Sequence, residues 1–290
     1  MTEKVFVIGG TGNIGELVVR QLLENNVQVT LYTRSPAKAQ SMFPNAAIVQ
    51  GDYEDLKPLG KALEGHTRLF LLVTDYVCMG RIKGAISSMA YSAGVKQVVD
   101  ISSLAVELPW RSSFLGHAHR QGEEAILANP NRQGYYVALR PSMFMSNHLW
   151  IDVHTIKNQN VLRHTAEPDE LEGWISTNDI ADLTVRVLLE PVEKHGDAVY
   201  EMNGCVLTPK ERAATFSRIL GRDITYEQIS PQEKYNYITQ TMGAPHLMAL
   251  DLVSLFKGVN QQVSMCLPIL LGREPESFEE YLKQHKHVFE

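Results

Sequence analysis

The chain has 290 residues, of which 44% are hydrophobic and 21% charged, and its formal net charge is −6. This length suffices for one large α/β domain and a smaller lobe, and the acidic balance argues against a broad nucleic-acid-binding surface. The three cysteines, Cys78, Cys205 and Cys266, form no CxxC pair, which argues against a disulfide framework or a thiolate zinc site.

The first residues contain no basic segment followed by a long apolar run, so no signal peptide is expected. The most apolar later stretch, Met265–Leu271, is far shorter than the roughly 20 residues that cross a bilayer. We therefore expect a cytoplasmic protein with no membrane partner, no direct nucleic-acid partner and no metal.

In the N-terminal half, short β-branched runs alternate with longer segments of helical spacing. The predicted strands are Lys4–Ile8, Val27–Thr33, Ala47–Gln50, Arg68–Thr74, Gln97–Ser102 and Tyr135–Arg140. The predicted helices are Gly12–Asn25, one that begins at Ser35-Pro36, Ile82–Ala93 and one that contains Gln121–Ala128. This alternation predicts a parallel sheet with right-handed crossovers.

After Pro141 the pattern changes. Further helices are predicted at Ser146–Lys157 and Asn178–Leu189, from Thr208-Pro209 onward, and after Gln228 to about Leu282. Further strands are predicted at Leu171–Thr177, Ala198–Asn203 and Ile224–Gln228. We expect an α/β fold: a doubly wound Rossmann domain over 1–150, to which 175–203 return, and a smaller C-terminal α/β lobe over 151–174 and 204–290 that holds a substrate or partner. The expected ligand site is a cleft between the two parts.

A glycine-rich turn follows the first strand. Gly9, Gly12 and Gly15 have GxxGxxG spacing between a strand and an amphipathic helix, which is the context of a dinucleotide site. Gly9 permits the tight turn, Gly12 allows close approach of the pyrophosphate, and Gly15 allows close helix packing. The pyrophosphate would lie at the positive end of the helix.

The second strand is followed by basic residues. NAD sites usually place an acidic residue here for the ribose hydroxyls, whereas this chain has Arg34, with Lys38 one helical turn later. A guanidinium pairs well with a 2′-phosphate, so NADP(H) is favoured over NAD(H). The alternative is that both residues are solvated surface charges.

Three further strand ends carry candidate cofactor contacts. Asp52 can accept from the adenine amino group, cap a turn, or do both. Thr74 ends the fourth strand, and Ser102 ends the fifth, near the expected nicotinamide. The Ser102 hydroxyl could bond the substrate or the carboxamide, or cap the next helix.

The segments GGTGNIG, TRSP, GDYED, AGVKQVVDISS and LRPSMFMSN, in this order, resemble the NmrA-like branch of atypical short-chain dehydrogenases. The resemblance runs from about Val5 to the helix after Trp174, with a looser fit beyond. It implies an NADP-preferring Rossmann domain, and its members include quinone or aldehyde reductases and non-catalytic redox sensors that bind proteins. It places Gly9, Thr11, Gly12, Asn13, Ile14, Arg34, Asp52, Tyr53 and Thr74 at cofactor-contacting positions.

Standard short-chain dehydrogenases use a Tyr-x-x-x-Lys pair on the helix after the fifth strand, and this chain lacks it. That helix contains His119 and Arg120, and in NmrA-like relatives a His or Lys commonly precedes such a Glu-rich turn. As an imidazolium near neutral pH, His119 could donate a proton to a developing oxyanion. Alternatively His117, His119 and Arg120 only position the cofactor or face solvent.

Residues after the sixth strand are candidates for the substrate wall. Phe144, Met145, Asn147, His148 and Trp150 should line the cleft beside the nicotinamide, and Trp174 should join them. Ordinary packing of the lobe is the alternative. His148, Asp152 and His154 match no standard metal-site spacing.

Two functions remain open. The first is an NADPH-dependent oxidoreductase that reduces a quinone, aldehyde or conjugated carbonyl by hydride transfer. The missing tyrosine does not exclude this activity, because orientation carries much of such a rate, but it argues against standard alcohol–ketone chemistry. The second is a non-catalytic NADP(H)-binding redox sensor that regulates a protein partner.

Overall fold

The computed structural model describes residues 3–130, 132–254, 259 and 262–290. These residues group into two compact units. The first contains residues 1–106, 117–140 and 180–200, and the second contains 107–116, 141–179 and 201–290. The helices expected before Leu282 include residues 255–258 and 260–261, which lie outside the described residues.

A seven-stranded sheet forms the centre of the first unit. Its strands are β1 (Lys4–Ile8), β2 (Gln28–Thr33), β3 (Ala47–Gln50), β4 (Arg68–Leu71), β5 (Gln97–Ile101), β6 (Tyr135–Pro141) and β10 (Val199–Met202). Their order in the sheet is β10-β6-β5-β4-β1-β2-β3, and the pairs from β3 to β6 are parallel. Strand order reverses at β1, so the crevice between the carboxyl ends of β1 and β4 is the ligand position that this topology dictates.

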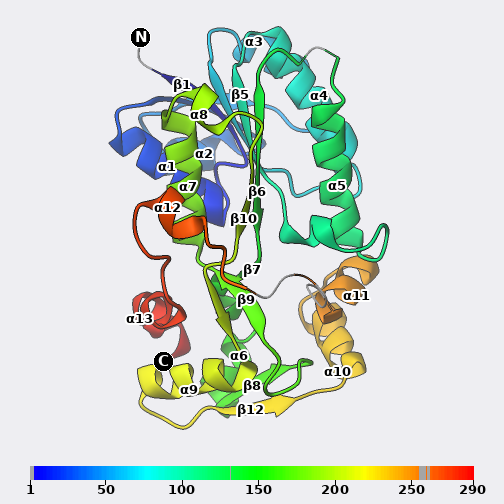
Figure 1. Cartoon of the computed structure of the whole chain (residues 1–290), viewed down its shortest axis with the longest axis vertical. Coiled ribbons are helices and arrows are strands. Elements are labelled where there is room, and N and C mark those ends of the chain that lie inside the picture. Colours follow the sequence, from blue (N-terminus) through cyan, green and yellow to red (C-terminus); the bar gives the residue numbers. More distant parts are fainter. Residues whose placement is uncertain (1–2, 131, 255–258, 260–261) are drawn as a thin grey trace. The chain divides into compact units, whose positions relative to one another are not determined.

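Helices cover both faces of this sheet (Figure 1). They are α1 (Asn13–Glu24), α2 (Pro36–Met42), α3 (Lys57–Ala62), α4 (Met79–Ser92), α5 (Phe114–Leu127), α7 (Thr177–Leu189), α8 (Val192–His195) and the 3-10 turn η1 (Leu104–Glu107). Figure 1 shows α3, α4 and α5 on one face and α1 and α7 on the other. The predicted Rossmann-type α/β fold is thus confirmed.

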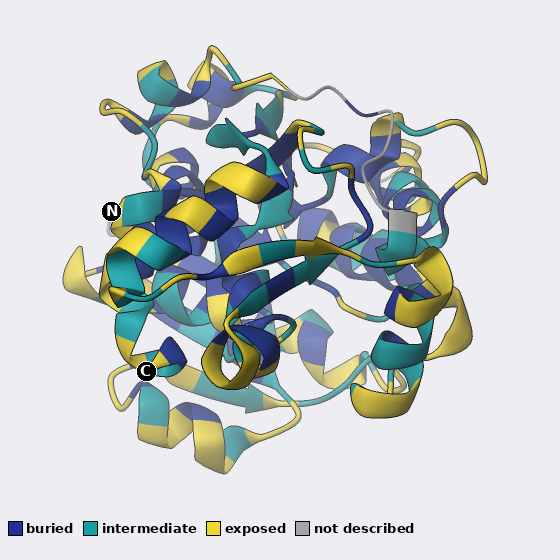
Figure 2. Cartoon of the chain, turned by 90° about the horizontal axis from the view of Figure 1, so that it is seen from below, coloured by how far each residue is buried: buried dark blue, intermediate teal, exposed yellow. Residues whose placement is uncertain are grey.

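Buried strands with near-continuous apolar sequence form the core, as expected for a parallel sheet covered on both faces. The helices present exposed residues outward and buried residues inward (Figure 2). The fourth predicted strand was too long: β4 ends at Leu71, so Val73 and Thr74 lie in the loop after it. The chain must leave the sheet there to reach α4, which begins at Met79.

The second unit contains two small sheets. The first has the order β11-β9-β7, made by β7 (Met143–Phe144), β9 (Glu172–Ile175) and β11 (Cys205–Leu207). The second pairs β8 (Val161–His164) with β12 (Thr225–Gln228) in parallel. Around them lie η2 (Met145–Leu149), α6 (Val153–Gln159), α9 (Pro209–Leu220), α10 (Pro231–Asn236), the π-helical turn η3 (Tyr237–Thr241), α11 (His246–Ser254), α12 (Leu267–Leu271) and α13 (Phe278–Phe289). The predicted helix Ser146–Lys157 is in fact η2 followed by α6.

A carboxylate of α11 caps the start of α5. Asp251 accepts from the Ser113 hydroxyl at 2.9 Å, the Phe114 N–H at 3.0 Å and the Leu115 N–H at 2.5 Å. The first N–H groups of a helix have no partner within the helix, so this distant side chain supplies one.

We expect Asp251→Ala to lower the free energy of unfolding by about 1–2 kcal/mol, because two helix N–H groups lose their acceptor. Asp251→Asn keeps an acceptor oxygen and should lose less than half as much. Urea denaturation measures both; an alanine variant as stable as the wild type would show that the cap contributes nothing.

Candidate active site

The glycine loop has the geometry of an anion cradle. Gly9 has φ of +87°, and a Cβ there would lie 2.6 Å from the carbonyl oxygen of Leu72. A Cβ on Gly15 would lie 2.1 Å from the Gly9 carbonyl oxygen, so close packing excludes any side chain. A Cβ on Gly12 would meet no atom closer than the Gly9 carbonyl oxygen at 3.8 Å, so this residue borders open space.

Gly12 is also the N-cap of α1, and no side chain caps this end of the helix. Asn13 is exposed, Thr11 is half-buried, and the Ile14 side chain is buried in the core, which leaves only its backbone for a ligand. A helix start with uncapped N–H groups beside open space suits a phosphate group.

Two cations belong to this end of the sheet, and one of them contacts the glycine loop. Lys38 donates from Nζ to the carbonyl oxygen of Thr11 at 3.4 Å, which places its charge at the loop. Arg34 is exposed, and its charge acts on Asp52 and Tyr53, which follow the neighbouring strand β3. The four residues therefore belong to one end of the sheet.

Asp52 is first of all a turn residue. Its Oδ1 accepts from the backbone N–H groups of Glu54 at 2.8 Å and Asp55 at 3.0 Å. These bonds, with the Arg34 charge, lower the pKa of the Asp52 carboxyl. Burial raises the pKa of Tyr53 to about 12 despite Arg34, so this phenol stays protonated.

Ser102 and Thr74 differ in their surroundings. Thr74 is exposed in the loop after β4. Ser102 is buried, and its hydroxyl donates to Glu123 Oε1 at 2.5 Å. The Glu123 carboxylate also accepts hydrogen bonds from Arg140 Nε at 2.9 Å and from Arg140 Nη2 at 2.6 Å. The single proton of the Ser102 hydroxyl is therefore engaged with α5 and not available to a carboxamide.

His119 lies on α5, one turn before Glu123, and is 8% exposed. Its ring contacts that of Tyr76 at a centroid distance of 5.8 Å, and its Nδ1 is buried without a hydrogen-bond partner. Burial and the nearby Lys83 charge hold the pKa of His119 well below its ordinary value. The expectation of an imidazolium near neutral pH is therefore wrong, because the site disfavours a second cation.

A buried ionic network close to His119 was missed by the sequence interpretation. Lys83 of α4 and Asp100 of β5 are both fully buried, with Nζ 2.7 Å from Oδ1 and 2.8 Å from Oδ2. The Tyr136 hydroxyl donates to Asp100 Oδ2 at 3.0 Å, and Lys83 also donates to the carbonyl oxygen of Ile101 at 3.2 Å. The signal was present: Asp100 interrupts an apolar strand, and Lys83 lies on the apolar face of its helix.

We expect Lys83→Met to lower the free energy of unfolding by about 3–5 kcal/mol, because it leaves the Asp100 carboxyl buried without a cation. Lys83→Met combined with Asp100→Leu should recover most of that loss, since no unpaired charge remains. Chemical denaturation distinguishes the two; equal losses in the single and double variants would mean that the unpaired charge is not the cause.

The predicted substrate-wall residues lie in the second unit. Met145, His148 and Trp174 are at most 3% exposed, so they fill its core instead of lining an open surface. The His148 ring stacks on Trp174 at 4.7 Å, and its Nδ1 is 2.6 Å from Asp152 Oδ2. Phe144 and Asn147 keep partial exposure, and Trp150 is exposed.

The core of this unit also buries charge. Arg212 lies over the Trp174 ring at 4.5 Å and forms an ion pair with Glu172. Burial, with the Arg212 and Lys234 charges acting against Asp152, lowers the pKa of His148. This packing explains why the His148 and Trp174 side chains point inward.

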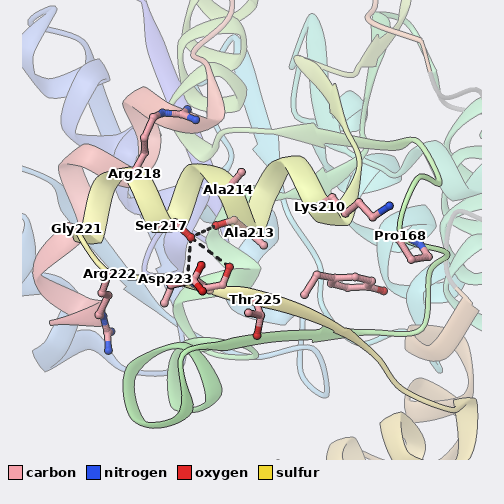
Figure 3. Close-up of a pocket in the computed structure, with 12 residues that line it drawn as sticks. Pro168, Lys210, Ala213, Ala214, Ser217, Arg218, Gly221, Arg222, Asp223 and Thr225 are labelled. Atoms are coloured by element: carbon pink, nitrogen blue, oxygen red, sulfur yellow. Dashed lines mark hydrogen bonds between the residues drawn. The ribbon is translucent and has the colours of Figure 1, made fainter.

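A cavity of about 910 Å³ lies between α9 and β12 of the second unit (Figure 3). Its polar groups are bonded within the protein: the Ser217 hydroxyl accepts from the Ile224 N–H at 2.8 Å, and Arg222 donates to the Phe289 carbonyl oxygen at 2.8 Å. We assign no ligand to it.

The described ranges hold no candidate metal site and no candidate membrane-spanning helix. They contain no group of three or more His, Cys, Asp or Glu side chains arranged to hold a metal ion. They also contain no helix with the length and apolar character needed to cross a membrane.

Comparisons with known proteins match nearly the whole chain. A sequence model described as "NmrA-like family" matches residues 1–282. The chain is 29% identical over 299 residues to an NAD(P)H azoreductase of Xenophilus azovorans, covering 98% of this chain and 99% of the relative. It is 26% identical over 290 residues to a (4-alkanoyl-5-oxo-2,5-dihydrofuran-3-yl)methyl phosphate reductase of Streptomyces griseus, with 98% and 99% covered.

Among solved structures, the NADPH complex of an NADPH-dependent quinone oxidoreductase from Escherichia coli is similar, with a TM-score of 0.83 and 25% identity. The similarity covers 99% of this chain and all of that one.

Proposed function

Because the chain belongs to the NmrA-like family, we propose that it is an NADPH-dependent oxidoreductase that reduces a quinone, aldehyde or conjugated carbonyl by hydride transfer. The observation that carries this proposal is the open cradle at Gly12, at an uncapped helix start, with Lys38 bonded to the loop and Arg34 just after the neighbouring strand β2. The azoreductase and quinone oxidoreductase named above support the same class of reaction.

The residues present fit the dinucleotide. The N–H groups at the start of α1 would bond the pyrophosphate, and Gly12 leaves room for it. Arg34 would pair with the 2′-phosphate in fork geometry, with Lys38 adding a second positive charge. Thr74 and the turn at Asp52 and Tyr53 would border the cofactor along the same sheet edge.

When bound, NADPH supplies a hydride from its nicotinamide ring. The protein's task is then to hold the acceptor against that ring and to stabilise charge on the acceptor oxygen. His119 is our candidate for the second role, and Phe144 and Asn147 are the candidate substrate contacts that keep partial exposure.

Calorimetric titration with NADPH, NADP+ and NADH, followed by a panel of quinone, aldehyde, conjugated carbonyl and azo acceptors, tests the proposal. We expect tighter binding of NADPH than of NADH and turnover of at least one acceptor. Tight NADPH binding without turnover of any acceptor would favour a redox sensor that regulates a protein partner.

A further inference from the structure

The two nitrogens of the His119 ring differ, because only Nδ1 is a buried atom without a hydrogen-bond partner. Nδ1 is buried and has no hydrogen-bond partner, while the residue as a whole keeps 8% of its surface exposed. A protonated imidazole has two N–H groups, and burying one of them without an acceptor is unfavourable. The neutral ring with its proton on Nε2 avoids this, because Nδ1 then carries only a lone pair.

A fixed cation lies against the same helix. A Cβ on Gly122 would be 2.8 Å from Lys83 Cδ, so the lysine chain crosses α5 at Gly122, one turn after His119 and on the same face. Gly84 makes a similar close approach, since a Cβ there would be 3.1 Å from the Ala125 side chain. Small residues thus let α4 and α5 approach closely enough to bury a lysine between them.

The carboxylates around His119 are already neutralised. Asp100 of β5 is paired with Lys83 of α4, and Glu123 of α5 is paired with Arg140 of β6. From the loop after β4 comes the neutral phenol of Tyr76, whose pKa burial raises. Both of these carboxylates are thus already paired with a cation, and neither is left to stabilise an imidazolium at His119.

We propose that His119 acts as a neutral hydrogen-bond donor through Nε2–H, and that Lys83 is the positioning residue that keeps the ring in this state. The ligand of this donor is the reacting oxygen of the acceptor, so the inference rests on the proposed function. The low pKa of His119, which follows from burial and from Lys83, agrees with it.

The chemistry balances without a protein acid. The hydride reaches the acceptor carbon, the carbonyl electron pair moves onto oxygen, and the Nε2–H bond stabilises the oxyanion that forms. A water molecule then supplies the proton. A neutral histidine can act in this way because a donor that stabilises charge does not have to give up its proton.

The charge state is measured by ¹⁵N NMR of histidine-labelled protein bound to NADP+, with the His119 signals assigned by their loss in His119→Gln. We expect the ring to stay neutral, with the proton on Nε2, through the range around pH ~6.5 where an ordinary histidine titrates. In the Lys83→Met, Asp100→Leu double variant, the pKa of the His119 ring should be higher than in the wild type, because the Lys83 charge is gone. A wild-type ring that titrates near ~6.5 would overturn the inference, whether or not any acceptor is turned over.

Kinetics then test the role. His119→Gln keeps an amide N–H donor but cannot transfer a proton, so kcat/KM should stay within about tenfold of wild type, whereas His119→Phe should lose about 100-fold. The wild-type rate should show no histidine limb between pH ~5.5 and ~8. Equal losses in both variants, with a wild-type rate that follows protonation of one group, would identify a general acid and contradict the inference.

Circular dichroism of both variants controls for folding. If no acceptor is reduced, the proposed function fails, and the NMR titration still decides the charge state by itself.

Discussion

Replacing Arg34 by alanine is expected to weaken NADPH binding by about 10- to 100-fold and to leave NADH binding nearly unchanged. A hydrogen bond to a charged group contributes about 1.5–3 kcal/mol, and only NADPH carries the 2′-phosphate that the guanidinium would pair with. Arg34 is exposed just after β2, the strand that pairs with β1, so its removal should not disturb the core.

Lys96→Ala is the matched control, because it removes one exposed positive charge just before β5, at the amino end of the sheet. Calorimetric titration of wild type and both variants gives the comparison. Equal loss of NADPH and NADH affinity in Arg34→Ala, or an equal effect of Lys96→Ala, would count against the specific pairing.

Replacing Gly12 by aspartate is expected to separate folding from cofactor binding. Aspartate is a good N-cap, and a Cβ at Gly12 meets nothing closer than 3.8 Å, so the variant should be at least as stable as wild type. Its carboxylate would, however, occupy the N–H groups and the space that the pyrophosphate needs. We expect at least about a 100-fold loss of affinity for NADPH and NADH alike, since two charge-assisted bonds are lost.

Gly12→Asn keeps the size without the charge and should lose less affinity. Thermal unfolding and titration of the two variants measure both quantities. Full NADPH affinity in Gly12→Asp would show that the cradle does not bind the pyrophosphate.

Local rules predicted the first unit well. The order of short buried strands and amphipathic helices gave β1 with the bounds Lys4–Ile8, and α1 within one residue at each end. Glycines were interpretable because each has a steric reason: Gly9 needs its positive φ, and Gly15 must touch the Gly9 carbonyl. Such constraints act over a few residues and are therefore visible in sequence.

The two buried charges left a signal in the sequence, but the pairing between them did not. Lys83 and Asp100 belong to elements that the fold brings together, and each alone resembles an error in an apolar pattern. For the same reason the charge state of His119 could not be derived from the sequence. It depends on a lysine from another helix and on the burial of Nδ1 without a hydrogen-bond partner. The bond from Ser102 to Glu123 could not be predicted either, because it joins the end of β5 to a different element, α5.

In the second unit, residue type was a poor guide to exposure. His148 and Trp174 have the chemistry of a substrate wall, yet they stack on each other inside the core. A polar ring is buried readily when a partner such as Asp152 satisfies it, and that partner could not be assigned before the turn η2 was known.

Transfer of deuterium from C4-deuterated NADPH to a conjugated carbonyl, followed by mass spectrometry of the reduced product, tests the central proposal most directly. We expect one deuterium at carbon in the product, with the oxygen-bound hydrogen taken from solvent. A product that forms without carbon-bound deuterium from either face of the nicotinamide, or NADPH that binds and is never consumed by any acceptor, would contradict hydride transfer by this protein.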